Sequence, residues 1–292
     1  MITGALLVQA LISGLLMGGI YALVALALAL SFGVLRVLNF AHGDLLMMAM
    51  YGAVVLHRWL GLHPYWAIVV LALPMLALGW LMFVGLIRPL QHAGVLVQAQ
   101  MTLGVSFVLQ SAALMIFGAD LLNVRTEMEM VVLRIEGVVV SVPLAIGFAV
   151  SLLISGALSW VLLGTDAGRR VRATAQDPDM ARLCGVDVER TQRWVFALSV
   201  ALLAGVAGCL MTFSHVVPTA GLQYSVLALL VVMLGGLGDL KGAFIGGLLI
   251  GIAEALAGVF LNSAVGPAVI YVLFGLTLLF RPQGLFGRGM EA

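Results

Sequence analysis

Charge is the scarcest property of this chain. Only 9% of its 292 residues are charged, whereas a typical soluble domain carries about 25%. A soluble protein of this length must cover its surface with polar side chains, and this sequence has too few of them. Intrinsic disorder is excluded too, because it requires low hydrophobicity, and here 63% of the residues are hydrophobic. The composition therefore predicts a membrane protein.

Lysine and cysteine are almost absent. The one lysine, Lys241, is followed by Gly242, so the Gly-Lys-Ser/Thr element of a P-loop is missing and ATP is not hydrolysed by that route. Cys184 and Cys209 lie in a polar loop and an apolar run, which argues against a disulfide, and no metal-ligand spacing is present. The net charge of +1 provides no basic field for nucleic acid. We therefore expect no metal, no cofactor and no nucleic-acid partner.

The apolar runs are long and continuous. No charged residue precedes Arg36, and a spanning helix needs about 20 apolar residues. A transmembrane β-barrel would instead show short segments of alternating hydrophobicity. The sequence predicts an all-α, polytopic membrane protein with one transmembrane domain over residues 1–292 and about eight or nine transmembrane or re-entrant helices. They are expected near residues 5–30, 43–57, 66–87, 94–117, 140–163, 194–214, 222–237, 243–260 and 267–280.

Some of these helices look incomplete, and many contain glycine. The second, seventh and last are short for a full crossing, so at least one could be re-entrant or broken. Such backbone survives in a membrane only inside protein or beside a water-filled cavity. Among the 35 glycines, several lie four residues apart, which lets helix backbones approach closely. We interpret as packing contacts the pairs Gly14 and Gly18, Gly238 and Gly242, Gly242 and Gly246, and Gly247 and Gly251.

Two polar loops set the expected topology. Residues 165–193 are rich in arginine, so the positive-inside rule makes this loop cytoplasmic. Residues 120–137, one span earlier, are then outside, whereas Arg88 and the C-terminal tail are inside. The N-terminus is outside if the second helix crosses the membrane and inside if it is re-entrant, and the sequence leaves both open. The charges concerned are Asp120, Arg125, Glu127, Glu129, Arg134 and Glu136 outside, and Arg169, Arg170, Arg172, Arg182, Arg190, Arg193, Arg281 and Arg288 inside.

The arginine-rich loop contains a short polar helix. Asp177 before Pro178 is typical of a helix cap with proline in the first turn, and Gly185 suits the helix end. The predicted helix, about Pro178–Cys184, is too short to span and would lie on or project from the membrane surface. It either docks against a soluble partner or belongs to a solvated loop that anchors topology. Its small apolar patch would be formed by Met180, Ala181, Leu183 and Cys184.

Polar residues also interrupt the apolar runs. Asp44 could cap the second helix and pair with Arg36, or the start of that helix could face a cavity and favour a substrate carboxylate. Glu254 lies in an apolar run, either as a proton site or, more modestly, as a polar contact between helices or with a partner subunit. His215 and Pro218 either shape the mouth of a pore or merely break a helix. Expected interfacial aromatic residues are Trp59, Tyr65 and Trp66.

One set of motifs resembles a known family. Asp179-x-Ala181-x-x-x-Gly185 is similar to the acidic-Ala-Ala-x-x-x-Gly loop of ABC importer permeases, with Met180 where a small residue is usual. In order and spacing, further segments over nearly the whole chain resemble the permeases of branched-chain amino-acid ABC importers. These segments are Gly19–Ala22, Asn39–Asp44, Gly168–Ala173, Gly235–Gly238, Gly246–Ala255 and Pro282–Leu285.

The resemblance implies a half-transporter. Two permease subunits, usually paralogues, would form the pore, two cytoplasmic ATPase subunits would drive it, and a periplasmic or lipid-anchored binding protein would deliver the substrate. The chain would be a multi-pass protein of the bacterial inner membrane and not itself an enzyme. The resemblance assigns coupling to the ATPase to Arg172, Asp177, Asp179, Ala181 and Gly185. The candidate translocation path comprises Asn39, His42, Gly43, Asp44 and Glu254.

Three rival functions make different predictions. A secondary transporter driven by an ion gradient would work alone, with Glu254 or Asp44 as its coupling site. A membrane enzyme would need His42 and Asp44 for turnover, and the lack of clustered titratable groups argues against it. A passive channel would conduct regardless of ATP. The substrate is left open among branched-chain amino acids, urea, short amides and other small carboxylates.

Overall fold

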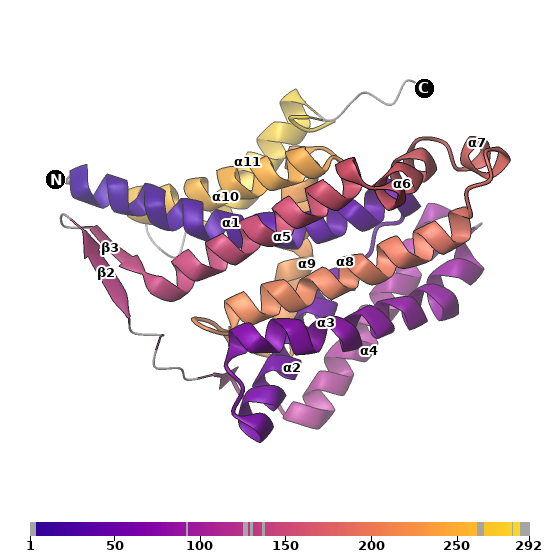
Figure 1. Ribbon diagram of the computed structural model, residues 1–292. Coiled ribbons are helices and arrows are strands. Elements are labelled where there is room, and N and C mark those ends of the chain that lie inside the picture. The colour runs from indigo at the N-terminus through magenta and orange to yellow at the C-terminus, as the bar shows by residue number, and fades with distance from the viewer. Residues whose placement is uncertain are drawn as a thin grey trace.

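The computed structural model describes residues 4–91, 93–124, 128, 131–135, 138–261, 266–281 and 283–286. It confirms an all-α polytopic fold (Figure 1), and among the described helices six are long and apolar enough to cross a membrane. Each of the expected helices is present. They are α1 (Gly4–Leu35), α2 (His42–Leu60), α3 (Pro64–Met82), α4 (Val95–Phe117), α5 (Val142–Gly164), α8 (Val188–Leu210), α9 (Ala220–Gly235), α10 (Leu240–Phe260) and α11 (Gly266–Phe280).

The polar loops have more structure than expected. In the arginine-rich loop, α6 (Asp166–Gln176) precedes α7 (Pro178–Leu183), and α6 begins where the Thr165 hydroxyl accepts the Gly168 N–H at 3.1 Å. At the other end, β1 (Leu122–Asn123) pairs antiparallel with β4 (His215–Val216), and β2 (Val132–Ile135) with β3 (Val138–Ser141). Arg125, Glu127, Glu129, Glu136, Pro282 and Arg288 lie outside the described residues.

The centre of the bundle is the contact between α1 and α10. Two of the expected glycine pairs face each other there: a Cβ on Gly14 would lie 2.7 Å from the Gly251 carbonyl oxygen, and one on Gly18 would lie 2.9 Å from that of Gly247. No side chain fits at such separations, so glycine lets the two backbones touch. The interpretation of these glycines as packing contacts is therefore confirmed.

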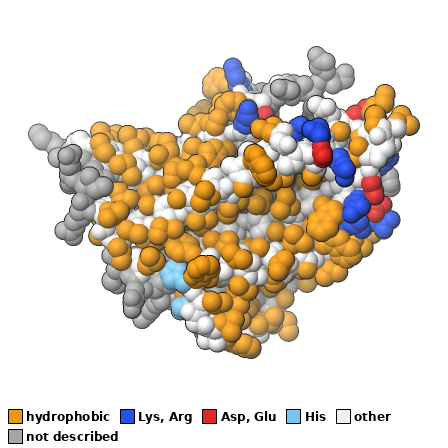
Figure 2. All heavy atoms as spheres, viewed as in Figure 1, with side chains coloured by type: hydrophobic (Ala, Val, Ile, Leu, Met, Phe, Trp, Pro, Cys, Tyr) orange, Lys and Arg blue, Asp and Glu red, His pale blue; other side chains and the backbone are white. Residues whose placement is uncertain are grey.

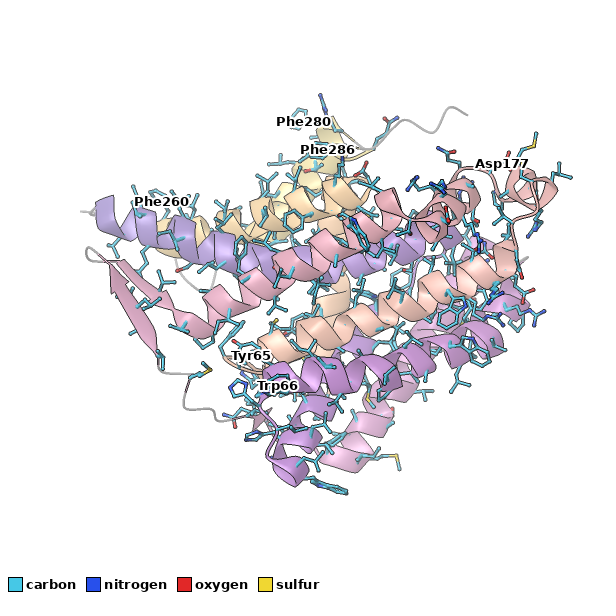
Figure 3. The ribbon with its side chains drawn as sticks, in the orientation of Figure 1. Tyr65, Trp66, Asp177, Phe260, Phe280 and Phe286 are labelled. Carbon is cyan, nitrogen blue, oxygen red and sulfur yellow. The ribbon has the colours of Figure 1, made fainter. Side chains whose placement is uncertain are left out.

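The bundle has a charged end and an apolar flank. Figure 2 shows most of the visible Lys, Arg, Asp and Glu side chains gathered over the end that carries α6 and α7, while hydrophobic side chains cover the rest of this face. The start of α1 lies at the opposite end (Figure 1). Figure 3 likewise separates Asp177 from Tyr65 and Trp66. The α6–α7 end is the one that the positive-inside rule predicts to be cytoplasmic.

Helix α2 runs from the inside of the bundle to the end opposite α6 and α7. It begins inside the bundle, where His42 contacts the Val24 carbonyl of α1, and it leads through Gly61 into α3. The Tyr65 hydroxyl at the start of α3 donates to the Pro143 carbonyl at the start of α5, 3.2 Å away, so α2 ends at the end of the bundle where α5 begins. Helix α2 is not among the six helices that are long and apolar enough to cross a membrane, so the side of the N-terminal end of α1 stays a prediction.

Candidate functional site

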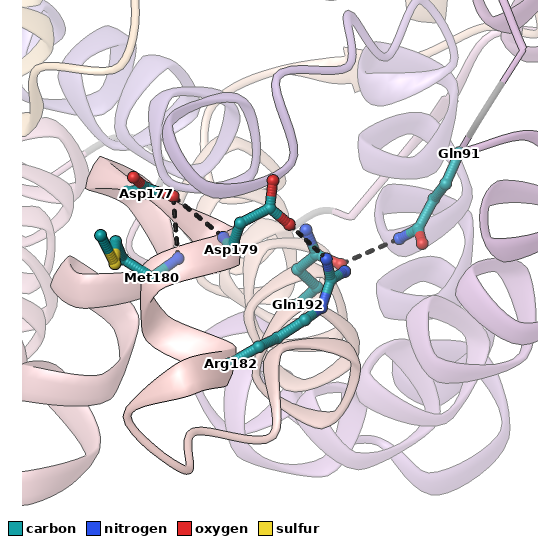
Figure 4. A network of polar contacts seen from close by, with 6 residues as sticks. All are labelled: Gln91, Asp177, Asp179, Met180, Arg182 and Gln192. Atoms are coloured by element: carbon teal, nitrogen blue, oxygen red, sulfur yellow. Dashed lines mark hydrogen bonds and ion pairs between the residues drawn. The ribbon is translucent and has the colours of Figure 1, made fainter.

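Helix α7 is a short, firmly capped element. The Asp177 carboxylate accepts the backbone N–H groups of Asp179 and Met180 at 2.9 and 3.0 Å, as Figure 4 shows. Asp179 forms an ion pair with Arg182 at 2.7 Å, one turn further on. At the other end, Gly185 takes the left-handed φ of +82° that favours glycine, and the Val186 N–H returns to the Ala181 carbonyl. The helix predicted at Pro178–Cys184 is thus confirmed as Pro178–Leu183.

The apolar patch on α7 is smaller than expected. Met180 and Leu183 are 60% and 82% exposed, whereas Ala181 is only 4% exposed. Ala181 therefore packs inward, against the neighbouring helices, and is not part of the surface patch. The exposed surface of α7 consists of two large apolar side chains beside an ion pair, at the charged end of the molecule.

Polar contacts tie the neighbouring helix ends together. Arg88 pairs with Glu189 at 2.9 Å, and Gln91 donates to Gln192 at 3.0 Å (Figure 4), so the segment between α3 and α4 is held to the start of α8. Arg172 lies on α6, and its Nη1 is buried with no hydrogen-bond partner among the described residues. Helix α7 thus projects from an end of the bundle where polar side chains hold neighbouring segments together.

The second candidate region is a junction of irregular backbone, which we define as residues 36–44. Side chains of other helices satisfy its backbone groups: Thr102 of α4 accepts the Phe40 N–H at 3.3 Å, and Ser225 of α9 donates to the Phe40 carbonyl at 2.8 Å. The Asn39 side chain accepts the Ala41 N–H at 3.1 Å. Irregular backbone at membrane depth requires such partners. The sequence could not show which helices would supply them.

Asp44 does not have the role expected of it. Ala41 occupies the cap position of α2, and no side chain caps the helix. Asp44 is fully buried, and its carboxylate accepts the Ser106 hydroxyl at 2.5 Å and the Gln110 amide at 2.9 Å, both from α4. Arg36 instead reaches the Gln176 carbonyl at 3.5 Å. The predicted helix cap by Asp44 and its predicted salt bridge with Arg36 are therefore wrong, because polar side chains of α4 bind the Asp44 carboxylate instead.

The rest of the junction fills the space between α1 and α9. His42 Nε2 donates to the Val24 carbonyl at 3.1 Å, and the ring is 1% exposed. The Gly43 N–H donates to Ser225 at 2.8 Å, and a Cβ on Gly43 would overlap the Gly221 carbonyl oxygen. Asn39, His42, Gly43 and Asp44 are thus brought together, and their polar groups are engaged within the chain.

Sequence reasoning missed the partner of this junction. Four polar residues of α4 recur at every fourth position, which places them on one face of the helix. That spacing in an otherwise apolar helix was a readable signal for a polar face directed into the protein. The residues are Gln98, Thr102, Ser106 and Gln110.

Glu254 belongs to a different place. It lines a cavity of about 420 Å³ between α1 and α10, in the half of the bundle away from α6 and α7, and Tyr21 lines the same cavity. Ser13, Ser141 and Phe213 also line this cavity. Glu254 is therefore separate from the junction with which the candidate path had grouped it. The roles expected of Glu254, a proton site or a polar contact, stay predictions.

The family follows from comparison with known proteins. Residues 10–281 match the family described as the permease component of the branched-chain amino acid transport system. The chain belongs to this family. It is 30% identical to the branched-chain amino acid permease BraD of Pseudomonas aeruginosa, over 96% of this chain and 95% of that protein. The permease LivH of Escherichia coli is 30% identical over the same shares, and a probable LivH of Methanocaldococcus jannaschii is 31% identical over 91% and 88%. No solved structure matches.

Membership of this branched-chain amino acid permease family agrees with the resemblance noted in the sequence. It makes the chain a multi-pass membrane protein of a transport system. The roles of individual residues have to be argued from the geometry above.

Proposed function

We propose that the chain is the membrane-spanning permease subunit of an ABC importer in the bacterial inner membrane, and that it moves branched-chain or related amino acids. ATP would be hydrolysed on two separate cytoplasmic subunits. A second permease would complete the pore, and a periplasmic or lipid-anchored binding protein would deliver the substrate. The relatives named above, which are permeases for branched-chain amino acids, support the substrate class.

One observation carries the proposal: α7 is a capped helix that projects from the arginine-rich end with Met180 and Leu183 exposed. Large exposed apolar side chains beside charges are suited to a cleft of a soluble partner. A helix with both ends fixed can transmit a push, which a mobile loop cannot. We assign to α7 the contact with the ATPase, with Asp177, Asp179 and Gly185 shaping the helix, Ala181 seating it and Arg172 in the supporting α6.

A shared pore fits the small number of polar groups within the membrane. A zwitterionic amino acid needs partners for both of its charges, and the polar groups of Asn39, His42 and Asp44 are already engaged. Passage would therefore use surfaces completed by the second permease or a rearrangement of the junction. Selectivity would reside mainly in the binding protein.

The test uses two glycines of the same backbone type. Gly185 and Gly61 both have positive φ, of +82° and +64°, and open space around the Cβ position, but they lie at opposite ends of the bundle. The protein is purified from its native membrane in mild detergent, and the associated subunits are identified by mass spectrometry. Gly185→Asp should insert normally yet lose the ATPase and amino-acid uptake, whereas Gly61→Asp should keep both. Normal uptake by Gly185→Asp would refute the assignment of α7.

The cavity at Glu254 favours one alternative, a secondary transporter driven by an ion gradient. Such a protein would transport alone in liposomes and would lose coupling when Glu254→Gln removes the carboxylate. The importer predicts no gradient-driven flux by the isolated chain and near-normal uptake by Glu254→Gln in the assembled complex. Recovery of the chain without any ATPase in several detergents would favour the alternative.

A further inference from the structure

A cavity at the cytoplasmic end, beside α7, has no role in the proposed function. It has a volume of about 710 Å³ and opens between the end of α5, α6 and the start of α8. Its deep wall is apolar, formed by Leu158 and Leu162 of α5 with Leu30 of α1 and Leu198 of α8. A cavity of this size suits a small organic ligand. A purely polar ligand is excluded, because it would have no favourable contact with this apolar wall.

The rim of the cavity is positively charged. Arg170 of α6 and Arg190 of α8 both line it. The ion pairs formed within the described ranges involve other arginines, namely Arg88, Arg169 and Arg182. The one carboxylate at the rim, Asp187, accepts the backbone N–H of Arg190 at 2.9 Å as the cap of α8. Two guanidinium groups and one carboxylate thus lie at the rim, and one oxygen of that carboxylate already accepts a backbone hydrogen bond.

Aromatic residues mark the depth of this cavity. Trp194, 48% exposed, lines it, and Trp160, 70% exposed, lies on α5 one turn before the helix ends. Exposed tryptophan at the ends of spanning helices is typical of the boundary between lipid and water. The leucine wall therefore lies at the depth of acyl chains, and the two arginines lie at the depth of lipid headgroups.

We propose that this cavity binds an anionic phospholipid of the cytoplasmic leaflet. Its phosphate would lie between Arg170 and Arg190, and part of its acyl chains would rest on the leucine wall. Basic pockets between spanning helices on the cytoplasmic side suit such headgroups. Cys184 and Gly185, where the chain returns from α7, line the same cavity, so a bound lipid would hold the base of α7. This lipid site requires that the cavity face the cytoplasmic leaflet, and it does not depend on which solute the protein transports.

The native cysteines provide a probe. Cys184 is exposed and lines the cavity, whereas Cys209 is buried. The full chain, with any subunits that co-purify, is reconstituted in nanodiscs of phosphatidylcholine with or without phosphatidylglycerol, and the rate of maleimide labelling is measured. Phosphatidylglycerol should slow labelling of Cys184. In a titration by native mass spectrometry, Arg170→Gln with Arg190→Gln should weaken phosphatidylglycerol binding roughly thirtyfold, on the basis of two arginine contacts near the headgroups.

A charge-matched control separates the site from the general surface charge. Arg169→Gln with Arg182→Gln removes two arginines from the same end outside the cavity, and should leave both the protection of Cys184 and the lipid affinity close to wild type. Equal affinity for phosphatidylcholine and phosphatidylglycerol would overturn the proposal, as would equal loss in the two double variants. Protection by inorganic phosphate alone would also overturn it and indicate a soluble anion instead.

Discussion

Helix α7 and the junction at residues 36–44 are both rich in polar residues, yet they are built in opposite ways. Helix α7 satisfies its own ends through Asp177 and Gly185, and it exposes Met180 and Leu183. The junction cannot satisfy itself and borrows Thr102 and Ser106 from α4 and Ser225 from α9. A helix that satisfies its own polar groups can move relative to its surroundings. A segment whose polar groups are satisfied by other helices can move only if those helices move too. Substitutions in the junction should therefore affect folding, and substitutions in α7 should affect function.

The largest effect is expected at Gly43. Gly43→Val adds side-chain atoms where even a Cβ would overlap Gly221, so α2 and α9 could not meet. The yield of monodisperse protein in detergent should fall at least about tenfold, because misassembled membrane protein is degraded. The control, Gly104→Val, lies on the exposed face of α4 with open space around it and should express normally. Normal yield of Gly43→Val would show that the helices are less tightly packed here.

The second largest effect is expected at Asp44. Asp44→Ala leaves the buried Ser106 hydroxyl and Gln110 amide without their acceptor, and each such group costs about 1–3 kcal/mol. We expect a clear drop in melting temperature in detergent. Asp120→Ala, on the exposed outer loop, should leave the melting temperature unchanged. If Asp44→Ala instead kept its stability and lost only transport, the junction would belong to the translocation path.

Two helix caps sharpen the comparison. Asp177 caps the projecting α7, and Asp239 caps α10 at 2.8 Å from the Gly242 nitrogen. Replacing either by alanine should cost about 1 kcal/mol locally. Because α10 packs along α1, Asp239→Ala should lower the melting temperature of the whole protein, whereas Asp177→Ala should leave it unchanged and reduce ATPase association. Equal melting shifts in the two variants would show that α7 is part of the cooperative core.

The smallest effect is expected at Arg36, where the chain leaves α1 with a φ of +57°. Arg36→Gly removes the strain of this left-handed backbone and should raise stability by at most about 1 kcal/mol. Arg36→Ala keeps the strain and removes only the contact with Gln176, so the difference between the two variants isolates the backbone effect. Normal expression of Arg36→Ala with a selective loss of uptake would instead indicate a role in transport.

Much of this architecture was readable from local patterns. Charge-free runs located the spanning helices to within a few residues, and Asp177, Pro178 and Gly185 predicted both ends of α7. Four-residue glycine spacing predicted close helix packing, but not that α1 and α10 would be the partners. In contrast, the sequence pattern did not predict α6. The arginines that dominate its amphipathic sequence are also typical of a polar loop. Asp44 was assigned to the nearest partner in sequence, Arg36, whereas its actual partners Ser106 and Gln110 lie on another helix.

The sequence by itself determined that this chain is a polytopic helical membrane protein with an arginine-rich end and a short capped helix there. These properties depend on hydrophobicity, charge and capping, which act within a few neighbouring residues. Only the tertiary structure decided that α2 leads away from the α6–α7 end, that Asp44 is satisfied by α4 and that Glu254 lies in a separate cavity. Those outcomes depend on which helices meet, and in a membrane nearly every apolar helix face can pack against another, so the choice is made by the whole bundle.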